Sequence, residues 1–133
     1  MNNEENNFVI NAISPDGKWL SVFEDDGETG YLYFCSMSPA GDMLGISDAL
    51  WIYNQIYPTI YECKEVHVVW SKDSLQSALI VDNELWGMFD LASKRKLNAS
   101  RENNSIVTIP VQVWQGGIPE DLGEPLDFVI KQP

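Results

Sequence analysis

Short runs of β-branched and aromatic residues, each closed by a turn sequence, recur along the first third of the chain. The first run spans residues 8–13 and ends at Ser-Pro-Asp-Gly (residues 14–17), where Pro and Gly occupy positions that they favour in a β-turn. The second run spans residues 18–24 and the third spans residues 29–36, with an acidic turn between them. This pattern predicts three strands joined by hairpins.

The third run is apolar on both sides. Tyr31, Tyr33 and Cys35 alternate with Leu32 and Phe34, and successive side chains of a strand point to opposite faces of its sheet. A strand with two apolar faces is typical of a central position. We therefore expect the third run to lie in the middle of its sheet.

The hydrophobic periodicity changes after the loop that follows the third run. Ser47 is a residue that can cap a helix, and Asp48 would lie in the first turn, where the helix dipole favours an anion. Nearby apolar residues fall at helical spacing, namely Ile46, Ala49, Leu50 and Tyr53. Pro58 follows the expected end. These signals predict a helix over Ser47–Gln55.

The second half of the chain returns to strand patterns. Residues 65–70, 75–81 and 85–90 read as a three-strand meander, and residues 106–114 read as a last strand, which Pro110 places at an edge. The sequence shows no internal repeat and no second domain.

The predicted fold class is therefore α+β. We expect one acidic globular domain over residues 1–133, with a mostly antiparallel β-sheet of about six to eight strands, formed by hairpins and a meander, and one main helix near residues 47–55. Residues 1–7 are expected to be a flexible N-terminus, and residues 115–133 a tail that lies over the surface.

Charge narrows the classes of partner. The 133 residues carry 20 acidic and 8 basic side chains, a formal net charge of −12. Such a charge repels nucleic-acid phosphates and anionic lipid headgroups and attracts a basic protein. We therefore expect a basic protein partner, no nucleic acid and no membrane. No apolar run approaches the roughly 20 residues that cross a bilayer, and Cys35 and Cys63 suit reduced thiols, so we expect a cytoplasmic protein.

The acidic turn is the first candidate site. Its carboxylates sit between two aromatic-rich strand patterns, and together with two residues of the expected helix they form the predicted partner-binding set: Glu24, Asp25, Asp26, Glu28, Asp48 and Trp51. Calcium loops place ligands at alternate positions over about twelve residues. The apolar Val22 and Phe23 break that alternation, so no metal site is expected.

No catalytic residue or cofactor is predicted. His67 is the only histidine, and the four residues that separate it from Cys63 along a strand span about 13 Å, too far for a thiol–imidazole hydrogen bond. An alternative stays open, in which a small enzyme or ligand-binding protein has a pocket between sheet and helix that uses Asp90, His67 or Cys35.

Two stretches carry a resemblance to a known family. Residues 19–53, with Phe-Glu-Asp-Asp-Gly-Glu-Thr-Gly-Tyr-Leu-Tyr (residues 23–33) and Ile-Ser-Asp-Ala-Leu-Trp-Ile-Tyr (residues 46–53), and the later pattern from Trp70 to Asp90 resemble a small, uncharacterised bacterial family known as domain of unknown function 2251. The resemblance covers most of residues 8–97 and implies no reaction.

Small acidic bacterial proteins without catalytic motifs often look like immunity proteins. Our leading hypothesis is a non-enzymatic protein-binding module, of the kind that inhibits a basic bacterial toxin by charge complementarity. The sequence does not give the oligomeric state, although an unpaired edge at residues 106–113 would allow a dimer.

Overall fold

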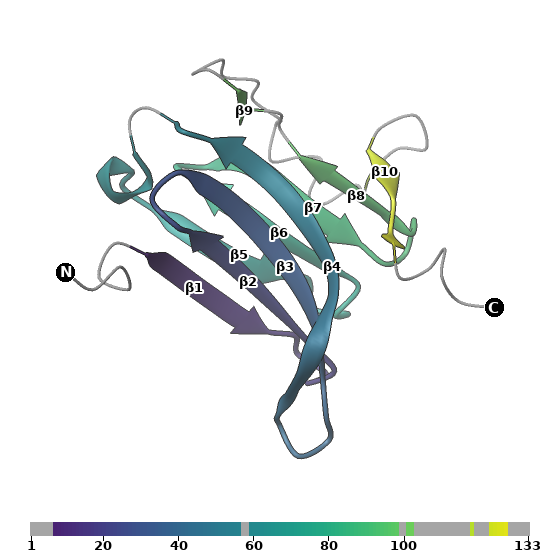
Figure 1. Ribbon diagram of the computed structural model, residues 1–133. Coiled ribbons are helices and arrows are strands. Elements are labelled where there is room, and N and C mark those ends of the chain that lie inside the picture. The colour runs from purple at the N-terminus through teal and green to yellow at the C-terminus, as the bar shows by residue number, and fades with distance from the viewer. Residues whose placement is uncertain (1–6, 57–58, 99–100, 103–117, 119–122, 128–133) are drawn as a thin grey trace.

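The computed structural model describes residues 7–56, 59–98, 101–102, 118 and 123–127, and this part of the chain is built almost entirely from β-strands (Figure 1). Two five-stranded sheets pack face to face. Sheet A has the order β1 (Phe8–Ile13), β2 (Trp19–Asp25), β3 (Thr29–Met37), β4 (Met43–Asn54) and β9 (Arg101–Glu102). Sheet B has the order β10 (Glu124–Pro125), β8 (Arg95–Asn98), β7 (Glu84–Asp90), β6 (Gln76–Val81) and β5 (Val66–Trp70). Neighbouring strands are antiparallel, except that β9 is parallel to β4.

The predicted helix is wrong, and with it the α+β fold class. The chain from Met43 to Asn54 is the single long strand β4, and no helix of seven or more residues occurs in the described part of the chain. A three-residue 3-10 helix, η2 (Ile60–Glu62), follows β4. No helix among the described residues is both long enough and apolar enough to span a bilayer. The expected strand at residues 106–114 lies outside the described residues.

Register shifts in β4 explain why its sequence imitates a helix. The pairing of β4 with β3 shifts by one residue between Gly30 and Tyr31 and again between Phe34 and Cys35. Each shift inserts an extra residue into β4, Ile52 at the first and Ser47 at the second. An inserted residue changes the phase of the alternation. Apolar residues therefore recur at intervals of three and four, as on a helix face, although the chain is extended.

The core lies between the two sheets. The inner face of sheet A contributes Phe23, Leu32, Phe34 and Leu50, and sheet B contributes Leu79, Val81, Trp86 and Phe89. A second cluster, formed by residues such as Met88, Leu97 and Ile118, covers the other side of sheet B. Gly87 lets β4 approach closely, because a Cβ there would lie 2.5 Å from the Ile52 side chain. In the expected tail, Leu126 is fully buried in the first cluster.

The two sheets repeat one four-strand meander, β1 to β4 and β5 to β8, and their first turns are built alike. Ser14 Oγ donates to Asp16 Oδ1 at 2.6 Å, and Ser71 Oγ donates to Asp73 Oδ1 at the same distance. The two turns also contact each other, since the Asp16 amide donates to Ser74 Oγ at 3.0 Å. This repetition was not recognised in the sequence.

Side chains of β8 cover the backbone edge of β4. Lys96 Nζ donates to the Ala49 carbonyl at 3.1 Å, and Asn98 Nδ2 donates to the Trp51 carbonyl at 2.6 Å. On the opposite side of the sandwich, Trp70 Nε1 donates to the Ala12 carbonyl at 2.8 Å. Both sides of the sandwich are thus closed by side chains that bond to the backbone of the other sheet.

A lateral row on the inner face of sheet A fixes the end of the acidic turn. Asp25 pairs with Gly30, and Gly30 pairs with Tyr53. The Tyr53 ring lies over Gly30, where a Cβ would be 2.5 Å from the ring. From there the Tyr53 hydroxyl donates to Asp25 Oδ2. The missing side chain of Gly30 thus allows a tyrosine on β4 to reach a carboxylate two strands away.

We expect Gly30→Ala to destabilise the fold by about 1 to 3 kcal/mol, because the new methyl group would displace the Tyr53 ring and overpack the core. Gly45→Ala is the matched control, since no atom lies within 4 Å of its Cβ position and its backbone needs no left-handed conformation. Urea unfolding of both variants measures the difference. Equal stability of the two variants would contradict the role assigned to Gly30.

Candidate functional site

The outer face of sheet A is the side that does not contact sheet B. Residues that pair across neighbouring strands share a face, so the register defines this surface as three lateral rows of four residues. The rows are Val9–Glu24–Tyr31–Trp51, Asn11–Val22–Tyr33–Ala49 and Ile13–Leu20–Cys35–Ile46. Of these twelve positions, two (Glu24 and Asn11) are polar and ten are apolar or aromatic. None is basic.

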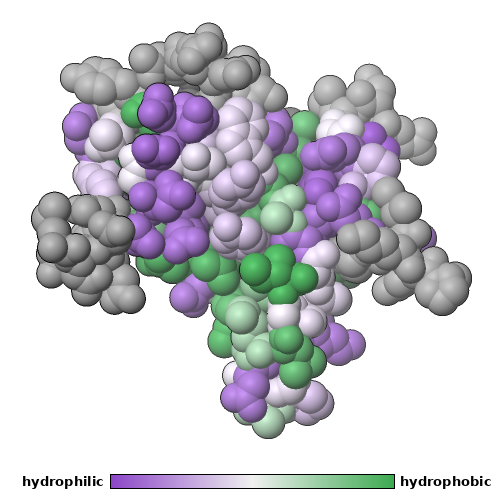
Figure 2. Space-filling view, in the orientation of Figure 1, coloured by the Kyte–Doolittle hydropathy of each residue, from purple (hydrophilic) through white to green (hydrophobic). Residues whose placement is uncertain are grey.

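This apolar face is open. Val9 is 51% exposed, Ile13 56% and Ile46 59%, while Tyr31 and Trp51 are half-buried. Figure 2 views the molecule from this side and shows hydrophobic residues gathered along the lower edge of the face and on the β3–β4 hairpin, which projects beyond the sandwich in Figure 1. Soluble monomers rarely leave contiguous apolar surface of this kind uncovered, and such surface marks interaction sites.

Aromatic side chains and one carboxylate form the middle of the face. The Tyr31 and Tyr33 rings are stacked, with centroids 5.8 Å apart and planes 13° from parallel. Glu24 is the direct neighbour of Tyr31 in the first row, and Trp51 is the neighbour on the other side. Burial and the charge of Glu24 raise the pKa of Tyr33. The Tyr33 phenol is therefore neutral at physiological pH and lies in a negative field.

The acidic turn stands at one end of this face, and Asp26 and Glu28 are exposed there. Asp26 Oδ1 accepts hydrogen bonds from the Thr29 amide at 2.9 Å and the Glu28 amide at 3.0 Å, and these bonds lower the pKa of Asp26. Asp26 therefore stays ionised well below neutral pH. The turn holds a fixed negative charge beside the aromatic residues.

Two of the predicted partner-binding carboxylates are instead inside the molecule. Asp48 lies between the sheets, where its Oδ1 is 2.7 Å from Lys96 Nζ and its Oδ2 accepts from the Asp127 amide at 2.7 Å. Asp25 is 6% exposed. Neither side chain can contact a partner across the outer face. Asp48 was misplaced because the predicted helix would have put it on the surface.

Of the six predicted partner-binding residues, the structure thus places Asp25 and Asp48 inside the molecule and the other four on or beside the outer face. Glu24 and Trp51 lie in one row of the outer face, and Asp26 and Glu28 lie in the turn beside it. The sequence reading missed Tyr31 and Tyr33 as site residues. Their alternation with Leu32 and Phe34 was the available signal, but it was taken as a sign of burial, whereas here it reflects one buried face and one open face.

The residues of the enzyme alternative do not come together. Cys35 belongs to the outer face of sheet A, and His67 is exposed on β5, opposite Ile80 of the cluster on the far side of sheet B. Asp90 is buried and holds a turn, since Oδ1 accepts from the Ala92 amide and Oδ2 accepts from Ser93 Oγ and from the Ile118 amide. The helix predicted over residues 47–55, which would have formed one wall of that pocket, is part of strand β4 up to Asn54.

Comparison with known proteins gives a family but no activity. The family model described as "Uncharacterized protein conserved in bacteria (DUF2251)" matches residues 3–115. The matched range contains the whole outer face and the acidic turn. No curated protein and no solved structure matches the chain.

We expect Lys96→Met to destabilise the protein by about 3 to 5 kcal/mol, because it leaves Asp48 buried without its cation. The double variant Asp48→Asn with Lys96→Met should recover much of this loss, since no charge then remains between the sheets. Urea unfolding of the two variants tests this, and a double variant no more stable than Lys96→Met would contradict it.

The same pair predicts a pH dependence. Burial alone would lower the pKa of Lys96, but the hydrogen bond and charge of Asp48 outweigh burial and raise it. The folded-state pKa then exceeds the unfolded value of about 10.4, so the stabilisation is complete below that pH and is lost as pH rises through the folded pKa. Unfolding free energies measured between pH 8 and 12, as a rough range around that value, should fall more steeply for the native protein than for the double variant.

Proposed function

We propose that this chain, which belongs to the DUF2251 family of uncharacterized proteins conserved in bacteria, is a non-enzymatic protein-binding module that holds a basic protein surface against the outer face of sheet A. The observation that carries the proposal is the open apolar face itself. Ten of its twelve positions are apolar or aromatic, yet three of these side chains are more than half exposed. A partner that covers the face would remove this surface from water.

The aromatic residues supply anchors for such a partner. Tyr and Trp are enriched among the residues that dominate binding energy at protein interfaces. Tyr31 and Tyr33 lie at inner positions of their rows and Trp51 lies at the end of the first row, and stacking holds the Tyr31 and Tyr33 rings together. Little conformational entropy is then lost when a partner packs on these rings.

Charge favours a basic partner. Glu24 lies within the face, Asp26 and Glu28 lie at its end, and no basic residue occupies the three rows. An arginine or lysine of the partner can place its cation over a tyrosine or tryptophan ring while its charge is balanced by Glu24. The net charge of −12 would also attract such a partner from a distance, in a salt-dependent way.

Within this proposal, an immunity-type inhibitor of a basic bacterial toxin is the specific hypothesis. It is supported by the acidic charge, by the bacterial family and by a face that offers binding contacts without a catalytic arrangement in the part of the chain that is described. Inhibition would follow from covering the basic active surface of a toxin. A partner-binding role in another bacterial assembly would use the same face.

The test compares two pairs of substitutions by pull-down from cells of the source bacterium at low salt. Tyr33→Thr with Glu24→Gln changes the outer face, and Leu75→Ser with Glu65→Gln is the matched control at exposed sites next to the other sheet. We expect the native protein and the control to recover the same basic protein. The outer-face variant should bind that protein about tenfold to a hundredfold more weakly, as loss of an interface anchor does.

Thermal unfolding first shows that both variants fold. The affinity of the purified complex should then fall as salt is raised, since exposed charges are screened over about 8 Å at physiological ionic strength. Recovery of no partner, recovery of an acidic one, or binding that ignores both salt and the outer-face substitutions would refute the proposal.

A further inference from the structure

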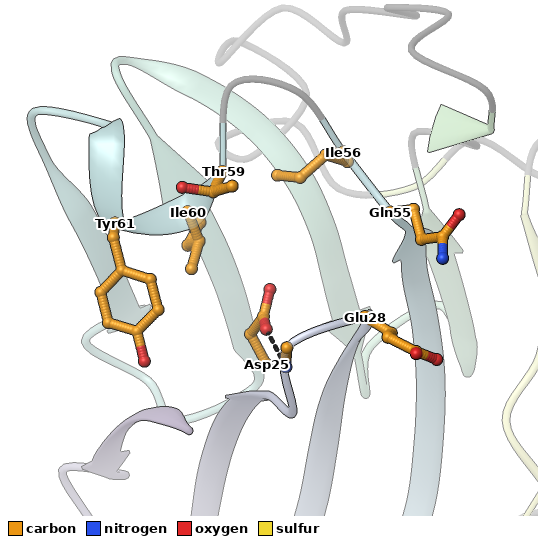
Figure 3. Close-up of a pocket in the computed structure, with 8 residues that line it drawn as sticks. Asp25, Glu28, Gln55, Ile56, Thr59, Ile60 and Tyr61 are labelled. Carbon is orange, nitrogen blue, oxygen red and sulfur yellow. Dashed lines mark hydrogen bonds between the residues drawn. The ribbon is translucent and has the colours of Figure 1, made fainter. Parts of the chain in front are cut away.

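A hollow of about 80 Å³ lies between the acidic turn and the segment that follows β4 (Figure 3). Its lining comes from two parts of the chain that are distant in sequence. The acidic turn contributes Asp25, Gly27 and Glu28, and the later segment contributes Gln55, Ile56, Thr59, Ile60 and Tyr61. The hollow adjoins the same end of sheet A as the row Val9–Glu24–Tyr31–Trp51, because Glu24 directly precedes Asp25 in β2. A partner seated on the outer face therefore reaches its entrance around the turn.

A buried carboxylate points into this hollow. The Asp25 side chain is directed between Ile60 and Ile56, whereas Glu28 at the rim points away (Figure 3). Asp25 Oδ1 accepts from the Gly27 amide at 2.6 Å, and Oδ2 accepts from the Tyr53 hydroxyl. Burial and Asp25 itself raise the pKa of Tyr53 above that of a free tyrosine, so this hydroxyl keeps its proton and donates. These two bonds orient the carboxylate.

Asp25 differs from Asp48, another buried carboxylate described above, in the charge of its neighbours. Asp48 is neutralised by Lys96 at 2.7 Å, but within the described residues no lysine or arginine forms a salt bridge with Asp25. A buried charge is costly unless an opposite charge is near it. The carboxylate is thus a site at which an incoming cation gains more than it would at an exposed acid.

We propose that this hollow receives a lysine side chain of the basic partner, with the ammonium group on Asp25 and the aliphatic stem between Ile56 and Ile60. The inference rests on the proposed function and names the residue type that the partner supplies. Apolar walls suit the methylenes, and the Thr59 hydroxyl offers a further acceptor at the wall. A volume of about 80 Å³ admits an ammonium group and the methylenes beside it, given about 30 Å³ for a water molecule.

The geometry favours lysine over arginine. A guanidinium group binds best when both oxygens of a carboxylate are free to accept its parallel N–H groups. Both oxygens of Asp25 already accept a hydrogen bond. An ammonium group is a compact point charge with three donors and can use the remaining lone pairs without a forked geometry.

The experiment titrates the ¹⁵N-labelled full chain with n-butylammonium, a probe for the lysine side chain, and with n-butylguanidinium for comparison. We expect n-butylammonium to shift the amide signals of Gly27 and Ile60, and to bind at least tenfold more tightly than n-butylguanidinium. Asp25→Asn should weaken binding at least tenfold. Asp73→Asn, which changes an exposed turn aspartate in the first hairpin of sheet B, should not.

Ile56→Trp gives an independent test if Asp25→Asn does not fold, because it fills the hollow and leaves the carboxylate in place. Ile56→Trp should also abolish the shifts that n-butylammonium causes in the amide signals of Gly27 and Ile60. The proposal is overturned if n-butylammonium leaves Gly27 and Ile60 unaffected in the folded native chain, if either pocket variant that folds binds as the native chain does, or if the guanidinium probe binds more tightly.

The outer-face variant and Ile56→Trp together separate the lysine site from the binding face. If the outer-face variant loses the partner and Ile56→Trp keeps it, the lysine site is refuted while the binding face stands. If the outer-face variant keeps the partner, the binding face is refuted whatever the probe titration shows.

Discussion

Sheet A has two apolar faces, but the described chain supplies only one sheet to pack against it. The inner face meets sheet B through Phe23, Leu32 and Leu50, and this contact is the main source of hydrophobic stabilisation in the sandwich. The outer face then has to meet solvent or another molecule. Of the ten apolar or aromatic positions there, Cys35 is buried, whereas Val9, Ile13 and Ile46 are more than half exposed. We propose that a partner covers this surface and that the acidic residues at the same face favour a basic one.

The buried carboxylates Asp48 and Asp25 differ in how their charge is compensated. Asp48 and Asp25 are both on β-strands of sheet A and both face inward. Asp48 is paired with Lys96 and with the Asp127 amide, so its charge joins β4, β8 and the C-terminal segment. Among the described residues, the hydrogen bonds that orient Asp25 come from two neutral donors, the Gly27 amide and the Tyr53 hydroxyl, and its carboxylate opens to a hollow. The first arrangement leaves no vacancy for a ligand, and the second leaves room for one cation.

Much of the strand framework could be predicted from the sequence, because alternation and turn residues act locally. The runs at residues 8–13 and 29–36, and the meander ending at residue 90, correspond closely to β1, β3 and β5 to β7. The helix was wrong because inserted residues at Ser47 and Ile52 shift the alternation, and a single sequence does not show where pairing slips. The burial of Lys96, which is 5% exposed, was also not predictable from local patterns, because its partner Asp48 lies 48 residues away in the sequence.

The site itself was only half predictable. Glu24 and Trp51 were named for their chemistry, but the fact that Tyr31 stands between them depends on the register of three strands, which local patterns do not fix. The repeated Ser-x-Asp turn at residues 14–16 and 71–73 was a usable signal. It would have suggested two equivalent meanders, and hence two sheets and no central helix.

The edge of β4 beside the open face has a consequence for aggregation. An exposed edge strand next to an apolar surface is normally a template on which further chains add as strands and grow into fibrils. Here three register shifts between β3 and β4 disturb the regular spacing of the edge, and side chains of β8 donate hydrogen bonds to the carbonyls of Ala49 and Trp51. This stretch of β4 therefore offers fewer free backbone groups for the addition of another strand, although the apolar face beside it is uncovered.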